Sequence, residues 1–188
     1  MEALGKLFSS PARLKLLRLF LFNDDKAFTL GDTALRAKVS KAAARKEITL
    51  LENTKVVKRR TGKIVSWTAN KSFPHYDPLL AFLRTTTTVK DSGILEALKR
   101  AGAIRLVVLS GLFTGTLETK VDILIVGDRL EERPLAQAIQ KLEAELGREL
   151  RYAAFPTRDF RYRQGVYDRL IRDVFDYPRR TILDKIGV

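Results

Sequence analysis

Apolar residues recur at helical spacing in the first third of the chain, and this pattern predicts three helices. The first begins after Ser9 or Ser10 and ends near residue 22. The second is expected between residues 29 and 38, and the third runs from Ser40 to about Asn53. In the third helix apolar residues fall at i, i+4 and i+7, so one face can pack against the preceding helices. These apolar residues are Ala44, Ile48 and Leu51.

A pair of short strands is expected directly after the third helix. Val56 and Val57 open the first strand, and Gly62 supplies the turn. The return strand begins at Ile64 and contains Trp67. Because Trp67 belongs to a half-buried strand, we expect its ring in the core rather than stacked on a base.

After residue 91 the pattern alternates between helices and strands. Helices are expected at 92–101, 134–146 and 167–175, and strands at 104–109, 121–126 and 149–155. This order predicts an α/β domain with a mixed sheet. Residues 74–91 hold two prolines, an apolar cluster and four threonines, which indicate a linker with a short helix. We therefore expect an α+β protein with two domains, 1–73 and 92–188.

Positive charge is concentrated in the first of these domains. The formal net charge is +13 over 188 residues. Residues 1–73 hold 16 Lys and Arg against 6 Asp and Glu, whereas residues 74–188 hold 19 against 16. A field of this sign attracts a polyanion, and nucleic acid is the usual candidate. The alternative is a protein that is simply kept soluble by its charge.

The composition also removes several kinds of chemistry from consideration. The chain has no cysteine and one histidine, His75, so disulfides, thiolate metal sites, His-based metal centres and Ser-His catalysis are not expected. No run of about 18 apolar residues is present, and Lys6 and Pro11 interrupt the apolar N-terminal region. We expect a soluble cytoplasmic protein with no cofactor and no membrane partner.

Cations and short side chains share the faces of the third helix that point away from its apolar stripe. Long cations beside alanines suit a helix that enters the major groove of DNA, because a bulky side chain would hold the backbone away from the bases. The hairpin adds a second basic cluster. Each cation taken alone can equally belong to a solvated surface, but together they favour DNA binding. The candidate DNA contacts are Ser40, Lys41, Ala42, Arg45, Lys46, Thr49, Arg59, Arg60 and Lys63.

Residues 7–73 resemble an ArsR-type winged-helix domain. The matching parts are the segment LFSSPARL at 7–14, the segment 39–51, and the basic hairpin that ends at 67–70. The resemblance implies that the third helix reads the major groove of double-stranded DNA and that the hairpin touches phosphate or the minor groove. It also implies a homodimer that reads paired half-sites. Lys55 departs from the family, which often has Gly between this helix and the strand.

Residues 109–127 resemble the nucleotidyltransferase superfamily in layout, and residues 147–163 resemble the small nucleotidyltransferase-like domains attached to some prokaryotic regulators. Such enzymes need a Gly-Ser turn for the triphosphate and two carboxylates, one residue apart, for Mg²⁺. Here only Asp122 is present, and Lys120 stands at the first acidic position. We expect no nucleotidyl transfer, and we favour a surface ion pair between these two residues over a phosphate bound by Lys120. The candidate vestigial nucleotide site is Ser110, Gly111, Lys120 and Asp122.

The sequence thus favours a DNA-binding transcriptional regulator that is not an enzyme. Its second domain would be an inactive nucleotidyltransferase-like sensor or dimerisation unit, with any small-molecule effector left open. One alternative is an active nucleotidyltransferase that uses the winged helix to dock a nucleic-acid or protein substrate. Another is a protein-interaction module. Five C-terminal arginines can extend the DNA surface, meet an acidic partner or simply be solvated: Arg158, Arg161, Arg163, Arg179 and Arg180.

Overall fold

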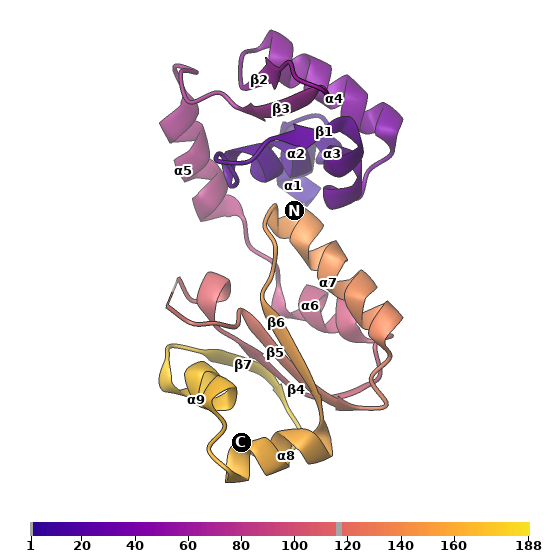
Figure 1. Cartoon of the computed structure of the whole chain (residues 1–188), viewed down its shortest axis with the longest axis vertical. Helices are drawn as coiled ribbons and strands as arrows, with labels where there is room; N and C mark the ends of the chain where they lie inside the picture. Colours follow the sequence, from indigo (N-terminus) through magenta and orange to yellow (C-terminus); the bar gives the residue numbers. More distant parts are fainter. Residues whose placement is uncertain (1, 116–117) are drawn as a thin grey trace. The chain divides into compact units, whose positions relative to one another are not determined.

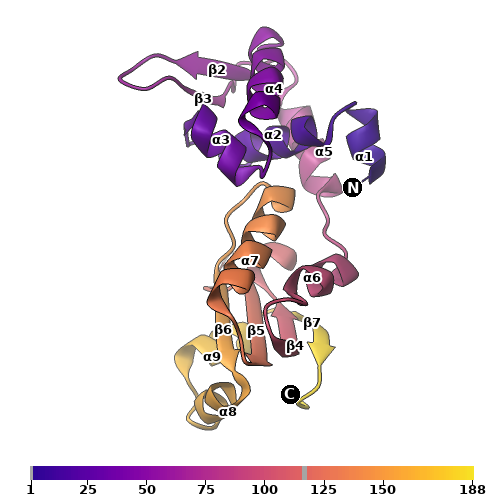
Figure 2. The same ribbon diagram turned by 90° about the vertical axis from the view of Figure 1, so that its right-hand side faces the viewer.

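The computed structural model describes residues 2–115 and 118–188 (Figure 1; Figure 2 gives the perpendicular view). The described residues form nine α-helices and two sheets, one of which is mixed, so the expected α+β class is confirmed. The chain divides into two compact units. Unit 1 comprises residues 1–90 and 140–148, and unit 2 comprises residues 91–139 and 149–188.

Unit 1 combines helices with a small antiparallel sheet. Its strands lie in the order β1-β3-β2, and β3 pairs with both neighbours. Its helices are α1 (Glu2–Leu7), α2 (Pro11–Leu21), α3 (Leu30–Arg36), α4 (Lys41–Asn53) and α5 (Tyr76–Thr86). Its strands are β1 (Phe28–Thr29), β2 (Val57–Arg60) and β3 (Ser66–Ala69).

Side-chain caps explain where the helices of unit 1 begin. The Ser10 hydroxyl accepts a hydrogen bond from the Arg13 N–H at 3.2 Å, and Ser40 does the same for the Ala43 N–H at 3.1 Å. Thr29 and Asp32 cap α3 reciprocally. Each cap satisfies an N–H that has no partner within the helix. The predicted starts after Ser10 and Ser40 are therefore confirmed.

Helices α3 and α4 end with the same backbone conformation. Lys38 follows α3 and Lys55 follows α4, both in the left-handed region, with φ of 50° and 63°. In each case the next residue donates its N–H back into the helix, from Val39 to the Ala34 carbonyl and from Val56 to the Leu51 carbonyl. These are Schellman ends, in which glycine is the preferred left-handed residue. Lys55 thus occupies the position where the resemblance leads us to expect Gly.

Two features of the small sheet differ from expectation. The two-residue strand β1 was not predicted, because it is too short to show an alternating pattern. The return strand begins at Ser66 rather than Ile64. Ile64 is 70% exposed and lies in the turn, so its apolar character does not report burial.

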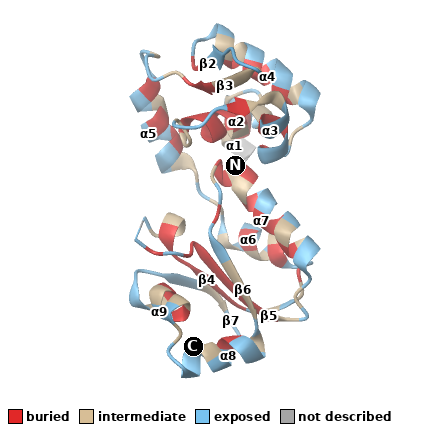
Figure 3. Ribbon diagram, in the orientation of Figure 1, coloured by how far each residue is buried: buried red, intermediate tan, exposed pale blue. Residues whose placement is uncertain are grey.

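Helix α5 lies in the predicted linker but belongs to unit 1. Its buried residues Tyr76, Leu80 and Leu83 complete the core formed by α2, α4 and the sheet (Figure 3). The Tyr76 hydroxyl donates to Asp24 at 2.8 Å, and Lys71 pairs with the same carboxylate at 2.9 Å. Burial, together with the Asp24 carboxylate, raises the pKa of Tyr76 to about 12. The chain first passes from unit 1 to unit 2 after residue 90.

Unit 2 is built on a four-stranded mixed sheet in the order β6-β5-β4-β7. Strand β5 is parallel to β6 and antiparallel to β4, which is antiparallel to β7. The strands are β4 (Ala103–Leu109), β5 (Ile123–Asp128), β6 (Tyr152–Pro156) and β7 (Arg180–Asp184). The helices are α6 (Asp91–Leu98), the 3₁₀ turn η1 (Gly111–Phe113), α7 (Glu132–Leu146, whose residues from 140 onward belong to unit 1), α8 (Thr157–Gly165) and α9 (Arg169–Asp176).

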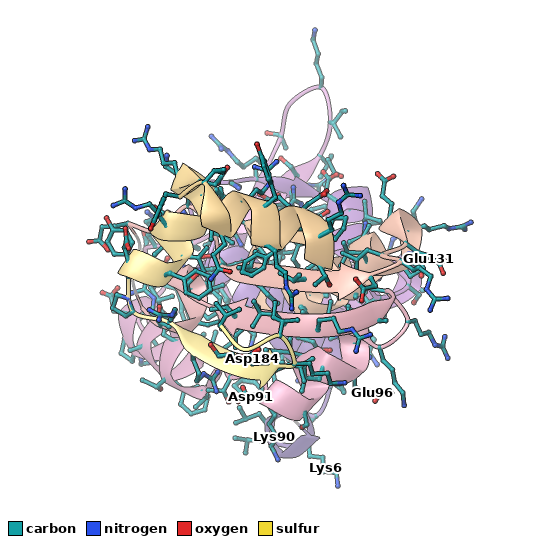
Figure 4. The ribbon with its side chains drawn as sticks, turned by 90° about the horizontal axis from the view of Figure 1, so that it is seen from below. Lys6, Lys90, Asp91, Glu96, Glu131 and Asp184 are labelled. Atoms are coloured by element: carbon teal, nitrogen blue, oxygen red, sulfur yellow. The ribbon has the colours of Figure 1, made fainter. Side chains whose placement is uncertain are left out.

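The inner parts of the two central strands, β4 and β5, are apolar because both of their faces are buried. Residues 106–109 and 123–126 are fully buried, and side chains from α8 and α9 join the same core. Helix α8 and strand β7 were not predicted. Figure 4 labels Asp184 on β7 and Asp91 at the start of α6. An ion pair between Arg180 and Asp91, 2.7 Å long, links these two elements.

Candidate nucleic-acid interface

Helix α4 presents two chemically distinct faces. The buried face carries Ala44, Glu47, Ile48 and Leu51, which pack into unit 1. The other side is exposed and basic. All nine candidate DNA contacts are exposed: Ser40, Lys41, Ala42, Arg45, Lys46, Thr49, Arg59, Arg60 and Lys63.

Both carboxylates of α4 form hydrogen bonds within unit 1, but only Glu47 is removed from the basic face. Glu47 is buried, and its Oε2 accepts a hydrogen bond from the Arg13 Nε at 2.8 Å. The Glu52 Oε2 accepts a hydrogen bond from the Trp67 indole N–H at 2.9 Å. Trp67 packs against the core of unit 1, as predicted. Glu47 is therefore withdrawn from the surface, whereas Glu52 is half-buried and lines a groove beside Arg45, so the cations of the exposed face outnumber one nearby carboxylate.

The cations of this face are not neutralised within the molecule. Lys41, Arg45 and Lys46 form no ion pair with any residue that the structure describes, and the same holds for the three hairpin cations Arg59, Arg60 and Lys63. An open depression of about 440 Å³ is lined by Lys41, Ala42, Arg45 and Lys46. Exposed, unpaired cations at a depression can reach an anionic ligand without first breaking an internal ion pair.

The hairpin and α4 meet at a second depression. The turn between β2 and β3 projects beyond the helices of unit 1 (Figure 2). A groove of about 590 Å³ is lined by Arg45 and Thr49 of α4, by Arg59 of β2, and by residues of the hairpin turn. The fold thus brings two predicted helix contacts, Arg45 and Thr49, and one predicted hairpin contact, Arg59, to the same groove.

Several residues of this groove were not among the predicted contacts. Thr29, Leu30 and Gly31 at the start of α3 line it, α4 adds Glu52, and the hairpin adds Ile64 and Val65. The apolar hairpin residues were assigned to a buried strand because they continue an apolar run. No sequence signal distinguishes an apolar residue in an exposed turn from one in a strand of this length.

The residues of the candidate nucleotide site are only partly brought together. Ser110, Gly111 and Asp122 are buried beside one another, and the Ser110 N–H donates to the Asp122 carbonyl at 2.9 Å. Gly111 has φ of 50°, and a Cβ on it would collide with the Asp122 carboxylate and the Thr119 hydroxyl. Lys120 is exposed, and its backbone N–H donates to Asp173 at 2.7 Å.

The Asp122 carboxylate is fully engaged by other protein groups. Its Oδ1 accepts from the Leu112 N–H at 2.9 Å and from the Arg151 Nη2 at 2.8 Å. Its Oδ2 accepts from the Arg151 backbone N–H at 2.9 Å and from the Arg151 Nε at 3.1 Å. The expected surface ion pair between Lys120 and Asp122 is therefore wrong, because the Asp122 side chain is buried and Arg151 is its partner.

The electrostatics of Asp122 follow from these bonds. Burial alone would raise the pKa of Asp122, but the hydrogen bonds from Arg151 and Leu112 outweigh it and hold the pKa below its ordinary value. Asp122 correspondingly raises the pKa of Arg151. A divalent cation needs open carboxylate oxygens, and here a guanidinium occupies both of them. The residues present do not fit a magnesium site, and no sequence motif had pointed to Arg151.

The described parts of the chain contain no cluster of three or more His, Cys, Asp or Glu side chains placed to hold a metal ion. Within the same residues, none of the helices has the length and apolar character needed to cross a bilayer. No protein-family model, no curated protein and no solved structure matches this chain.

Proposed function

We propose that this protein is a DNA-binding transcriptional regulator in which unit 1 acts as a winged helix. Helix α4 enters the major groove of double-stranded DNA, and the β2–β3 hairpin contacts phosphates or the minor groove. One observation carries the proposal. The exposed face of α4 carries Lys41, Arg45 and Lys46, while Glu47 is buried against Arg13 and Glu52 accepts a hydrogen bond from Trp67.

Shape and charge both support duplex DNA as the ligand. Ala42 lies beside the exposed cations, so the α4 backbone can approach base edges without a bulky side chain between them. Arg45 and Arg59 line one groove, which lets the helix and the hairpin contact the same duplex. Each cation that meets a phosphate releases a condensed counterion, which favours binding at low salt.

Unit 2 is proposed to be a catalytically inactive nucleotidyltransferase-like domain that serves as a sensor or dimerisation unit. The occupied carboxylate of Asp122 supports this reading, because two-metal transfer needs at least two open carboxylates. A homodimer would allow two copies of unit 1 to read paired half-sites.

The proposal is tested by selecting bound sequences from a random duplex pool with the purified protein at about 150 mM salt, where non-specific contacts are weakened. We expect a palindromic or repeated motif. On that motif, the Arg45→Ala and Lys46→Ala variants should each bind at least about tenfold more weakly. Lys99→Ala is the matched control, since it removes one exposed cation from unit 2.

Two results would contradict the proposal. The first is the absence of any enriched motif together with unchanged affinity in the Arg45→Ala, Lys46→Ala double variant. The second is transfer of label from a nucleoside triphosphate in the presence of Mg²⁺, abolished by Asp122→Ala. The second result would establish the alternative, an active nucleotidyltransferase that uses unit 1 to dock its substrate.

A further inference from the structure

The tyrosines of this chain are distributed unevenly between core and surface. The chain has five tyrosines, and Tyr76 is buried in unit 1. The other four all lie between residues 152 and 177 of unit 2, and all are exposed. They are Tyr152, Tyr162, Tyr167 and Tyr177. The phenylalanines of the same stretch point inward, since Phe160 is fully buried and Phe155 and Phe175 pack against the same core. The exposed tyrosine rings are therefore concentrated in this stretch of the chain.

Helix α8 carries the first part of this surface. Phe160 anchors the helix to the core, and Arg158, Arg161 and Tyr162 lie on the opposite side, where they are exposed. Figure 3 shows the exposed outer side of this helix. Arg158 and Tyr162 are four residues apart, so their side chains are neighbours on the helix surface. Tyr162 is 71% exposed, which leaves its ring available for contact.

The turn after α8 presents a second ring. Tyr167 is 77% exposed and has a left-handed backbone, with φ of 55°. Its N–H donates to the Gln164 carbonyl at 3.2 Å, and the Asp168 N–H donates to the Arg163 carbonyl at 2.9 Å. This is another Schellman end, where glycine is preferred and a bulky residue is strained. The turn leaves the Tyr167 ring outside the core, where it is available for contact.

The arginines of this region fall into two groups. Arg163 is structural, because it pairs with Asp168 at 2.8 Å and stacks over the Phe155 ring. Arg158, Arg161 and Arg169 are exposed and form no ion pair with a described residue. Asp159 is the carboxylate nearest to them along the helix. We call the set Arg158, Arg161, Tyr162, Tyr167 and Arg169 the α8 surface.

We propose that the α8 surface binds single-stranded RNA. Unpaired bases stack on Tyr162 and Tyr167, while the arginines of the surface contact the phosphates between them. Every base offers a π-face, so the contact tolerates different sequences. This inference concerns a different unit and a different nucleic acid from the proposed DNA contact of α4, and it does not depend on that contact.

The combination of rings and cations selects this ligand over two others. An acidic peptide would use the arginines but would leave two exposed rings without a partner. The bases of a DNA duplex are stacked inside the helix, and exposing them costs free energy before a tyrosine can stack on them. RNA presents unpaired bases in loops and tails without that cost.

The experiment measures fluorescence anisotropy of a labelled oligouridylate with the full-length chain. The starting protein carries Arg45→Ala and Lys46→Ala, so that the α4 cations add little to the signal and a failure of the DNA proposal cannot be mistaken for a failure of this one. Against this background, we expect Tyr162→Ala to weaken binding about tenfold. Tyr162→Phe keeps the ring and should keep the affinity within about twofold.

Tyr167→Gly separates a ligand contact from a structural role. Glycine relieves the left-handed strain, so the melting temperature should rise or stay constant while RNA affinity falls about tenfold. The Arg158→Gln, Arg161→Gln double variant should reduce the slope of log Kd against log salt by about 1.4, or about 0.7 for each phosphate that is no longer neutralised.

Three outcomes would overturn the proposal. Unchanged RNA affinity in both the Tyr162→Ala and the Tyr167→Gly variants would exclude stacking. Equal loss of affinity in Tyr162→Ala and Tyr162→Phe would show that the ring does not bind the base. Equal affinity for the oligomer of the same length that has deoxyribose in place of ribose would still support base stacking on this surface, but it would exclude RNA as the specific ligand.

Discussion

Glu47 and Arg13 form an ion pair that links α4 to α2, with 2.8 Å between the Glu47 Oε2 and the Arg13 Nε. The Glu47 side chain is 5% exposed and that of Arg13 is 26% exposed. Arg13 also donates to the Phe8 carbonyl at 2.8 Å. A carboxylate buried to this degree needs its partner, because an unpaired buried charge is costly. The pair therefore holds the inner face of α4 in place beneath its basic outer face.

Removing one partner of this pair should destabilise unit 1. We expect Arg13→Ala to lower the free energy of unfolding by about 1–3 kcal/mol, since Glu47 then remains buried without its cation. Urea unfolding followed by Trp67 fluorescence reports on this unit. Lys46→Ala, next to Glu47 but exposed, is the control and should change stability by less than about 0.5 kcal/mol. If Arg13→Ala lowered the free energy of unfolding by no more than Lys46→Ala does, the ion pair would not stabilise α4.

Glycine at position 55 should stabilise the protein. Lys55 has φ of 63°, and its left-handed conformation is strained for any residue with a Cβ. We expect Lys55→Gly to raise the free energy of unfolding by about 0.5–1 kcal/mol, which is the relief of strain less the added entropy of the unfolded chain.

The matched control for this substitution is Lys58→Gly. Lys58 is also an exposed lysine, but it lies in β2, where glycine should lower stability by about 0.5–1 kcal/mol. Thermal unfolding distinguishes the two variants by the sign of the change. A lower melting temperature for Lys55→Gly would contradict the strain argument.

The Asp122–Arg151 pair should contribute stability that depends on pH. Because the pKa of Asp122 is lowered in the folded chain, its contribution is complete above the ordinary value of about 3.9 and is lost as the pH falls below it. Asp122→Asn should therefore show a shallower loss of stability between about pH 4 and pH 2 than the parent protein. Urea unfolding across this range measures the difference.

Arg151→Met tests the same pair at neutral pH. It leaves the buried Asp122 with only backbone donors, and we expect a loss of about 1–2 kcal/mol, toward the lower end of the usual range because Arg151 is half exposed. Arg158→Met is the control, since Arg158 has no ion-pair partner among the described residues. Equal stability of the two variants would contradict the assigned role of Arg151.

Salt dependence should separate the roles of the hairpin and α4 in DNA binding. Arg59→Gln with Arg60→Gln should reduce the slope of log Kd against log salt by about 1.8, or about 0.9 for each phosphate that is no longer neutralised, and leave sequence preference unchanged. Arg45→Gln should instead alter the preferred base at one position. Anisotropy titrations on the selected motif and on single-base variants measure both effects. An altered preference in the hairpin variant would reverse the two assignments.

Local sequence patterns predicted most of the helices of unit 1 and its β2–β3 hairpin. The caps at Ser10 and Ser40 and the apolar stripe of α4 act within a few residues, so periodicity and cap chemistry predict them directly. The same reasoning missed β1 and β7, whose pairing partners lie far away in the chain. It also placed Ile64 in a strand, because an apolar residue in an exposed turn has the same local pattern as one in a sheet.

The sequence by itself determined the elements that depend on neighbours along the chain and the excess of positive charge in residues 1–73. Tertiary structure alone decided which charges remain available. It buried Glu47 against Arg13 and bonded Glu52 to Trp67, while Lys41, Arg45 and Lys46 stayed exposed. It likewise joined Asp122 to Arg151, 29 residues away. The physical reason is that desolvation and hydrogen bonding depend on groups brought together in space, and those neighbours cannot be read from spacing in the chain.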